Sequence, residues 1–172
     1  MPVSNADADI PSLAATIEDG GLFSITRSFY AQRVRHDAGV PVYSERAVCR
    51  STQREVIAQL QEAFGGTTAS RPSARRGVVF EWSARDRTAA EAAEVLLPFL
   101  QRRFHEASLV VALHRLKRSG GSGTRKVLVR SRRGQPVPMT RHFMTVQDVA
   151  ERERLYRAMQ ALHRPADQQS TG

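Results

Sequence analysis

The first apolar pattern of the chain is a short helical one that passes directly into an alternating one. Leu13 and Ile17 lie one helical turn apart, and the glycine pair at 20–21 favours helix termination, so a helix is predicted over about 11–19. Glu18 and Asp19 come just before the glycines, at the negative end of the helix dipole, where carboxylates are unfavourable. We therefore expect these two carboxylates to serve something other than helix stability.

Alternation with a period of two follows and predicts a hairpin with one polar face. In the first strand, expected over 22–34, Phe23 and Ile25 should face a core; the second strand is expected over 40–50. The opposite face is polar and basic, and a two-stranded ribbon of this kind fits the major groove of DNA, the alternative being a solvated sheet face. The residues expected to contact DNA, including two from the basic stretch 71–76, are Ser24, Thr26, Ser28, Arg33, Arg35, Arg46, Arg50, Arg75 and Arg76.

Three further helices and one or two more strands complete the pattern as far as residue 116. Capping-box spacings at Thr52 to Glu55 and at Thr88 to Glu91 predict two helix starts, and the fourth helix is expected over about 103–116. The third helix is expected to bury four residues, Ala92, Val95, Leu96 and Phe99. A strand around 78–83 carries Trp82, which we expect in the core. The resulting order of helices and strands predicts an α+β fold.

The composition changes after residue 116. Glycine, serine and basic residues dominate 117–138, which predicts a flexible basic linker that could order on a phosphate backbone. A C-terminal helix is expected within 139–164, and the tails 1–8 and 165–172 are expected to be disordered.

Charge and cysteine content narrow the possible partners and compartments. The net charge of +9 and sequence pI near 11.0 favour a polyanionic partner. All 26 cationic residues except Lys117 and Lys126 are arginines, which suits bidentate phosphate and guanine contacts or reflects genomic base composition. Cys49 is the only cysteine, and no leader or membrane span is evident, so a cytoplasmic protein without a disulfide framework is expected.

Other residues give weaker signals for chemistry. The five histidines lack metal-ligand spacing, and Cys49 is expected to be a semi-buried small residue. Glu45 and Glu81 are isolated strand carboxylates, which we expect to be solvated.

Three landmarks in the chain resemble those of the LAGLIDADG homing endonucleases. Residues 13–25 resemble the signature helix Leu-Ala-Gly-Leu-Ile-Asp-Ala-Asp-Gly with its strand Ser-Phe-Ser-Ile; the sequence Phe64-Gly65-Gly66 resembles the family's Phe-Gly-Gly turn; and residues 97–107 are similar to its Pro-Phe/Tyr-Leu-x-x-Lys-x-x-x-Ala junction. The resemblance implies one αββαββα domain over 9–116 with a C-terminal helical extension.

The resemblance also implies a function and a set of site residues. It implies a homodimer that binds double-stranded DNA at a specific site and cleaves both strands with Mg²⁺. The signature helices of the two copies would pack together at a two-fold axis. The interface residues implied are Leu13, Ala14, Ala15 and Ile17, and Arg103 takes the place of a basic residue near the scissile phosphates.

The chain departs from the family at the acidic residue that binds the metal, where ungapped alignment places Gly20. In one interpretation the helix end is shifted by one residue and Asp19 binds the metal, with Glu18 as a lesser candidate; the catalytic set is then Asp19, Glu18 and Arg103. In the other, the site is degenerate and the protein binds DNA, or intron RNA in the manner of a maturase, without cleaving. A basic structural RNA-binding protein is a third alternative.

Overall fold

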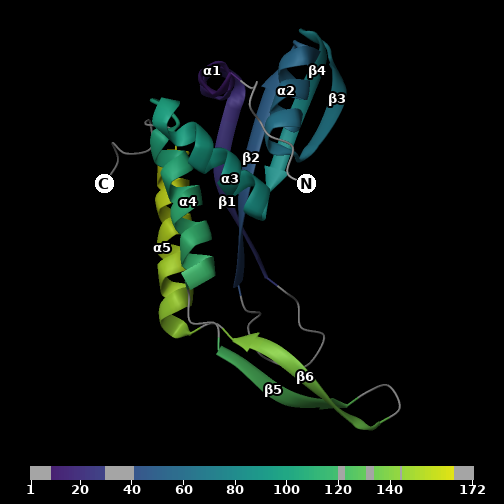
Figure 1. The fold of residues 1–172 in the computed structure, drawn as a ribbon, viewed down its shortest axis with the longest axis vertical. Coiled ribbons are helices and arrows are strands. Elements are labelled where there is room, and N and C mark those ends of the chain that lie inside the picture. Colours follow the sequence, from purple (N-terminus) through teal and green to yellow (C-terminus); the bar gives the residue numbers. More distant parts are fainter. Residues whose placement is uncertain (1–8, 30–40, 120–122, 131–133, 144, 165–172) are drawn as a thin grey trace.

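A computed structural model of the chain describes residues 9–29, 41–119, 123–130, 134–143 and 145–164. In chain order its elements are α1 (Ile10–Gly20), β1 (Gly21–Phe29), β2 (Pro41–Ser51), α2 (Arg54–Phe64), β3 (Thr67–Ser73), β4 (Gly77–Arg85), α3 (Asp86–Leu96), the 3₁₀ turn η1 (Leu97–Phe99), α4 (Phe104–Ser119), β5 (Gly123–Arg130), β6 (Pro136–Phe143) and α5 (Val146–Leu162). The α+β class and the expected αββαββα order are confirmed (Figure 1). None of the helices in the described ranges is long and apolar enough to cross a membrane.

A four-stranded antiparallel sheet in the order β1-β2-β4-β3 forms the centre of the fold. Its strands alternate between a buried face and an open face, as the period of two predicts. The helices cover the buried face, and its side chains there are less than 3% exposed: Phe23, Ile25, Tyr43, Ala47, Cys49, Trp82 and Ala84. The expected core positions of Phe23, Ile25 and Trp82 are therefore confirmed.

Close backbone contacts explain the glycine pair at the junction of α1 and β1. A Cβ atom at Gly20 would collide with the backbone carbonyl oxygen of Arg50, and one at Gly21 would lie 2.6 Å from the carbonyl oxygen of Ile17. No larger residue fits either position without displacing backbone. The helix therefore passes into the strand against β2 with no intervening loop.

Helix starts differ from those that the capping-box spacings predicted. The N-cap of α2 is Gln53, whose N–H donates to Ser51 Oγ at 3.0 Å, and no described side chain makes a capping hydrogen bond at this helix start. Helix α3 begins at Asp86, before Thr88, and Asp86 has a positive φ of 50°. In the third predicted helix, Val95 and Phe99 are 46% and 47% exposed, so the expectation that both are buried was wrong.

The region predicted as a flexible linker contains regular structure. Helix α4 continues to Ser119, and β5 pairs with β6 in an antiparallel two-stranded sheet that lies apart from the four-stranded one (Figure 1). The linker prediction for 117–138 was therefore wrong, and the helix expected within 139–164 is preceded by β6 and begins only at Val146. The tails 1–8 and 165–172 lie outside the described residues.

Two carboxylates on the helix-covered side hold α4 and α5 to the sheet. Glu45 on β2 is fully buried, and its Oε2 atom accepts a hydrogen bond of 2.6 Å from Lys117 Nζ near the end of α4. On α5, Glu153 accepts hydrogen bonds from the Tyr43 hydroxyl at 2.6 Å and from Arg27 at 2.9 Å. The expectation that Glu45 is solvated was wrong, because its partner is supplied by a helix 72 residues later in the chain.

Candidate nucleic-acid interface and acidic helix end

The open face of the sheet brings together most of the residues predicted to contact DNA. Strand register places Ser24 opposite Arg46 and Thr26 opposite Ser44. Ser28 and Arg50 share this face, since each lies an even number of residues from these positions along its strand. Arg33 and Arg35 lie outside the described residues.

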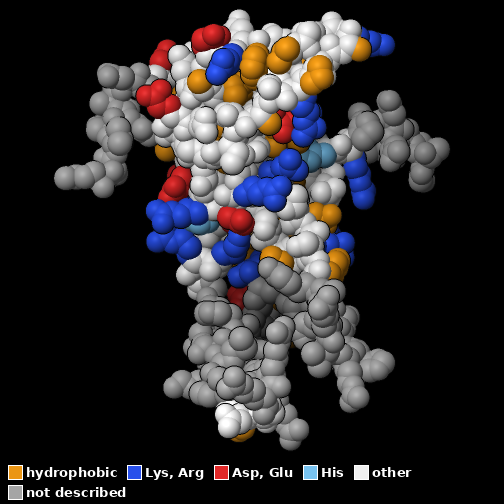
Figure 2. Space-filling view, turned by 90° about the vertical axis from the view of Figure 1, so that its right-hand side faces the viewer, with side chains coloured by type: hydrophobic (Ala, Val, Ile, Leu, Met, Phe, Trp, Pro, Cys, Tyr) orange, Lys and Arg blue, Asp and Glu red, His pale blue; other side chains and the backbone are white. Residues whose placement is uncertain are grey.

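Two arginines that the sequence pattern did not select extend this face. Register places Arg85 of β4 opposite Arg46, and Arg71 of β3 opposite Val79 on the same face. The alternation Glu81, Ser83, Arg85 along β4 was the available signal. Figure 2 shows Lys and Arg side chains forming a band across the middle of one side of the molecule.

The arginines of the open face differ in how far their charge is already neutralised. Arg46 Nε is buried and has no hydrogen-bond partner among the described residues, whereas Arg50 Nε contacts Glu81 Oε2 at 2.6 Å. A buried donor without an acceptor is unfavourable, so Arg46 is suited to an incoming acceptor atom.

Arg75 and Arg76 lie at the turn that joins β3 to β4, and both are exposed. Arg76 and Arg50 line the same shallow hollow of about 320 Å³, whose other lining residues are Ser51, Thr52, Ser73 and Val79. The structure therefore brings Arg76 to the basic face and places Arg75 next to it in the chain.

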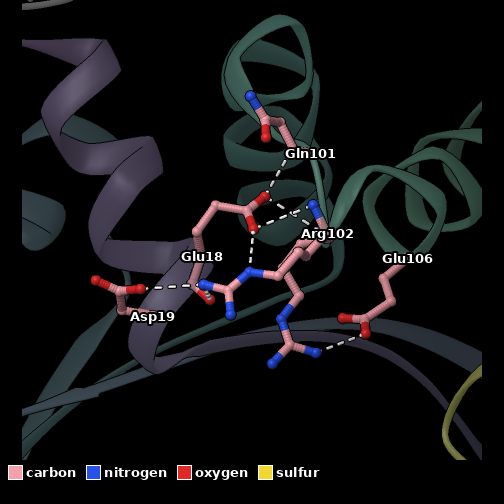
Figure 3. Close-up of polar contacts among 6 residues, drawn as sticks. Glu18, Asp19, Gln101, Arg102 and Glu106 are labelled. Carbon is pink, nitrogen blue, oxygen red and sulfur yellow. Dashed lines mark hydrogen bonds and ion pairs between the residues drawn. The ribbon is translucent and has the colours of Figure 1, made fainter.

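Glu18, at the end of α1, is fully engaged in holding the chain together. Its Oε1 atom accepts hydrogen bonds from the backbone N–H groups of Gln101 and Arg103 at 2.7 and 3.2 Å, and its Oε2 atom accepts from the N–H of Arg102 at 3.1 Å (Figure 3). Partial burial raises the pKa of this carboxyl, but these hydrogen bonds outweigh it and leave the pKa below its usual value. Glu18 thus joins α1 to the segment before α4, and it has no free oxygen for a metal.

Asp19 has the opposite environment. Its side chain is 85% exposed, and the contact that the structure gives it is an ion pair of 3.0 Å between Oδ1 and Arg102 Nη2. Because no side chain fits at Gly20, Asp19 is the last carboxylate that the end of α1 can present. Of the two carboxylates predicted as metal ligands, the geometry therefore leaves only Asp19 available.

The basic residue beside Asp19 is Arg102 and not the predicted Arg103. Arg103 donates instead to Glu106 Oε1 at 2.7 Å. Glu106 is itself buried, and its Oε2 atom accepts the N–H of Phe23 at 3.2 Å. Arg103 therefore belongs to a polar cluster beneath the start of β1, and the structure does not bring it to the Asp19 carboxylate.

The residues predicted to form a dimer interface divide into two groups. Leu13, Ala14 and Ile17 are at most 3% exposed within the single chain, so the prediction that they contact a partner was wrong: their helix face packs on this chain's own core. Ala15 is exposed, on the same face of α1 as Ser12 and Asp19. The helix therefore presents a narrow outer face of small residues that ends in a carboxylate.

A single copy supplies few ligands for a divalent metal. No group of three or more His, Cys, Asp or Glu residues in the described part of the chain is arranged to hold a metal ion. Mg²⁺ prefers carboxylate and water oxygens and keeps several waters, so one exposed carboxylate per copy is chemically suitable but incomplete. The residues fit a metal only if a second copy adds its own Asp19.

Comparison with solved structures identifies the fold. The archaeal intron-encoded homing endonuclease I-Vdi141I, complexed with DNA, has a TM-score of 0.57 and 11% identity over 96% of this chain and 90% of that one. The homing endonuclease I-CvuI, in complex with its target in the presence of Ca²⁺, has a TM-score of 0.51 and 16% identity over 64% of this chain and 68% of that one. The homing endonuclease I-TnaI has a TM-score of 0.50 and 12% identity over 91% and 99% of the two chains.

No protein-family model matches the sequence, and no curated protein sequence matches it. The structural likeness, at these low identities, concerns the architecture. This chain has the α+β fold of the LAGLIDADG homing endonucleases, in its single-domain form.

Proposed function

We propose that this protein is a site-specific double-strand DNA endonuclease that acts as a homodimer and requires Mg²⁺. The observation that carries the proposal is the combination of a basic open sheet face with an exposed carboxylate, Asp19, at the end of a helix with a small-residue outer face. DNA-bound homing endonucleases with the same fold support a DNA partner.

The open face supplies both kinds of contact that DNA recognition needs. Exposed arginines bind phosphates and position the protein, whereas side chains in a groove read base edges. Arg46 lies between Ser24 and Arg85 in the middle of the sheet, and its Nε atom has no partner within the ranges that the structure describes, so we assign base or phosphate recognition to it first.

The outer face of α1 supplies the surface for a second copy. Ser12, Ala15 and Asp19 are small enough for two helices to approach closely across a two-fold axis. Val95 of α3 and Phe99 of η1, which belong to elements in contact with α1, are about half exposed and would add apolar area. The two Asp19 carboxylates would then lie at the same interface.

Asp19 from each copy would hold Mg²⁺, which when bound stabilises charge on the phosphate and generates a hydroxide nucleophile. This chain's other residues prepare the site. Glu18 fixes the segment 101–103, and through it Arg102 reaches Asp19. Two Asp19 carboxylates at one interface would repel each other unless a cation lies between them. In a single copy, the ion pair with Arg102 neutralises the charge of Asp19.

The same contact favours a second candidate function, binding of DNA without cleavage. Arg102 already neutralises Asp19, and Gly20 cannot carry the acidic residue of the LAGLIDADG signature. In this second reading the open face still binds DNA, and the end of α1 serves only dimerisation.

Cleavage of a supercoiled plasmid library of randomised sites, with Mg²⁺ or Ca²⁺, separates the two candidates. We expect wild type to cut a discrete site with Mg²⁺ only, and Asp19→Asn to bind that site while its cleavage rate falls about 10³-fold or more. Glu62→Gln, which removes an exposed carboxylate from α2, is the matched control and should cut normally. Protection of one site by both wild type and Asp19→Asn without cleavage would establish the second candidate, and a monomeric wild type on DNA would contradict the dimer.

A further inference from the structure

The β5–β6 hairpin is the part of the molecule that the proposed function has not yet used. Its strands pair over eight residues each, from Gly123 opposite Phe143 to Arg130 opposite Pro136. Among the described residues, the two strands contact each other extensively and no other element to a comparable extent. Figure 1 shows the hairpin at one end of the long axis of the molecule, beyond the ends of α4 and α5.

The charge of the hairpin has a single sign. Residues 123–130 and 134–143 contain no Asp or Glu, although the chain has 17 of them, and they contain four cations: Arg125, Lys126, Arg130 and Arg141. Strand pairing also sets Arg125 directly opposite Arg141. Like charges directly opposite each other destabilise a strand pair, so this pairing indicates that the hairpin meets an external anion.

The helices that precede and follow the hairpin, α4 and α5, are each fixed to the four-stranded sheet. On the α4 side, Lys117 binds the fully buried Glu45 of β2. On the α5 side, a capping box between Thr145 and Asp148 starts the helix, and Glu153 binds Tyr43 and Arg27 of the sheet. The two helices that flank the hairpin in the chain are therefore both fixed to the four-stranded sheet.

We propose that the β5–β6 hairpin is a DNA-binding arm that contacts the phosphate backbone outside the stretch covered by the open sheet face. This inference rests on the proposed DNA partner. Eight strand residues span about 26 Å, which corresponds to about eight base pairs of duplex. Because its contacts are to phosphates, the arm adds affinity and length of footprint without adding sequence discrimination.

The dependence of DNA affinity on salt concentration tests whether the hairpin contacts phosphates. A hairpin variant replaces the four cations: Arg125→Gln, Lys126→Gln, Arg130→Gln and Arg141→Gln. A charge-matched control replaces four exposed arginines on the helices: Arg54→Gln, Arg87→Gln, Arg115→Gln and Arg154→Gln. A charge-retaining variant carries Arg125→Lys, Arg130→Lys and Arg141→Lys, and it shows whether charge or hairpin structure is responsible.

Binding is measured by fluorescence anisotropy from 50 to 300 mM KCl, on a duplex just long enough for the sheet footprint and on one extended by ten base pairs at each end. On the extended duplex we expect the hairpin variant to lose affinity by roughly 10- to 100-fold and to reduce the slope of log K against log salt by up to about 0.9 per lost phosphate contact. Its ratio of specific to non-specific affinity should stay at the wild-type value. The charge-matched control and the lysine variant should both keep the wild-type slope.

Any of five results would overturn the proposal that the hairpin is a DNA-binding arm. If wild type binds DNA and the hairpin variant keeps the wild-type affinity and salt slope, the arm proposal is contradicted while the proposed function stands. Equal losses in the hairpin variant and the charge-matched control would show that only net charge matters. A loss confined to the specific site would assign base reading to the hairpin in place of phosphate binding. Tighter binding to an RNA duplex of the same length would reject DNA as the partner, and absence of any DNA binding by wild type would reject the proposed function together with the arm.

Discussion

The two faces of the four-stranded sheet differ in how their charged side chains are paired. On the helix-covered face the carboxylates have ionic partners: Glu45 lies against Lys117, and Glu153 against Arg27 and the Tyr43 hydroxyl. Glu45 Oε1 accepts no hydrogen bond among the described residues, but His114 Nδ1 lies 3.5 Å from it. On the open face, Arg46 has a buried Nε atom with no hydrogen-bond partner in the described part of the chain, and Arg85 lies opposite it on the next strand. Removing one member of a buried charge pair destabilises the fold, whereas a buried donor without an acceptor can gain a hydrogen bond when a ligand binds.

This difference indicates which substitutions should affect folding and which should affect binding. Loss of a charge on the covered face leaves its partner in a poorly solvated place, so the free energy of unfolding should fall. Loss of a charge on the open face removes a group that water already solvates in part, so stability should hardly change while DNA affinity does.

The largest expected effect is on the covered face, for Glu45→Gln. The substitution keeps the size of the side chain but removes the 2.6 Å carboxylate partner of Lys117, whose side chain is 27% exposed and which then keeps only the 3.4 Å contact with Asp86. We expect the free energy of unfolding in urea to fall by about 3 kcal/mol. Glu94→Gln, which removes one partner of the exposed pair with Arg115, is the control and should cost less than about 1 kcal/mol.

The double variant Glu45→Gln with Lys117→Gln should recover part of this loss, because the Lys117 charge is removed together with its 2.6 Å partner. Equal costs for Glu45→Gln and Glu94→Gln would show that the buried pair does not fix α4 to the sheet.

The sequence was informative where structure depends on neighbours along the chain. The spacing of Leu13 and Ile17 and the glycines at 20–21 predicted the helix and its end, and alternation predicted which side of β1 is buried. It was less informative for β3, whose residues are nearly all exposed and show no apolar alternation. The hairpin at 123–143 was missed because its glycine and arginine content resembles that of a linker.

Site residues were predictable as residue types but not as environments. Nothing near Glu18 in the sequence shows that the N–H groups 83 to 85 residues later bind it, and nothing near Glu45 shows Lys117. Adjacent carboxylates thus acquired opposite roles: Glu18 became structural and Asp19 remained exposed. Long-range partners, which only the fold brings together, decided this.

The second effect in size is a pH dependence of stability that comes from Glu153. The Tyr43 hydrogen bond, with smaller contributions from Arg157 and Arg27 and against an opposing effect of burial, lowers the pKa of this carboxyl from 4.5 to about 2. A group with a lowered folded-state pKa stabilises the protein above its unfolded pKa, and the contribution is lost as pH falls through the folded pKa. We therefore expect stability to fall by about 2 kcal/mol between pH 4.5 and 2 from this group.

Thermal unfolding by circular dichroism from pH 6 to pH 2 checks this expectation against Glu153→Gln. The variant should be less stable than wild type at pH 6, and the difference should shrink as the pH approaches 2. The exposed pair partner Glu94 provides the control, since Glu94→Gln should follow the wild-type profile. A constant difference between wild type and Glu153→Gln at every pH would show that the ionised carboxylate is not what holds α5.

The smallest effect lies on the open face, for Glu81→Gln. Glu81 contacts Arg50 at 2.6 Å and is a carboxylate on a face that otherwise carries arginines. Glu81 itself is only 12% exposed, but the Arg50 side chain left behind is 63% exposed and stays solvated, so the free energy of unfolding should change by less than about 1 kcal/mol. Since the Arg50 charge is then free to meet a phosphate, DNA affinity at 150 mM salt should rise a few-fold, and the salt slope should steepen by about 0.9. Arg46→Gln removes a positive charge from the same face, so it should weaken DNA binding and leave stability unchanged. If both substitutions left DNA affinity unchanged, the open face would not be the DNA-binding surface.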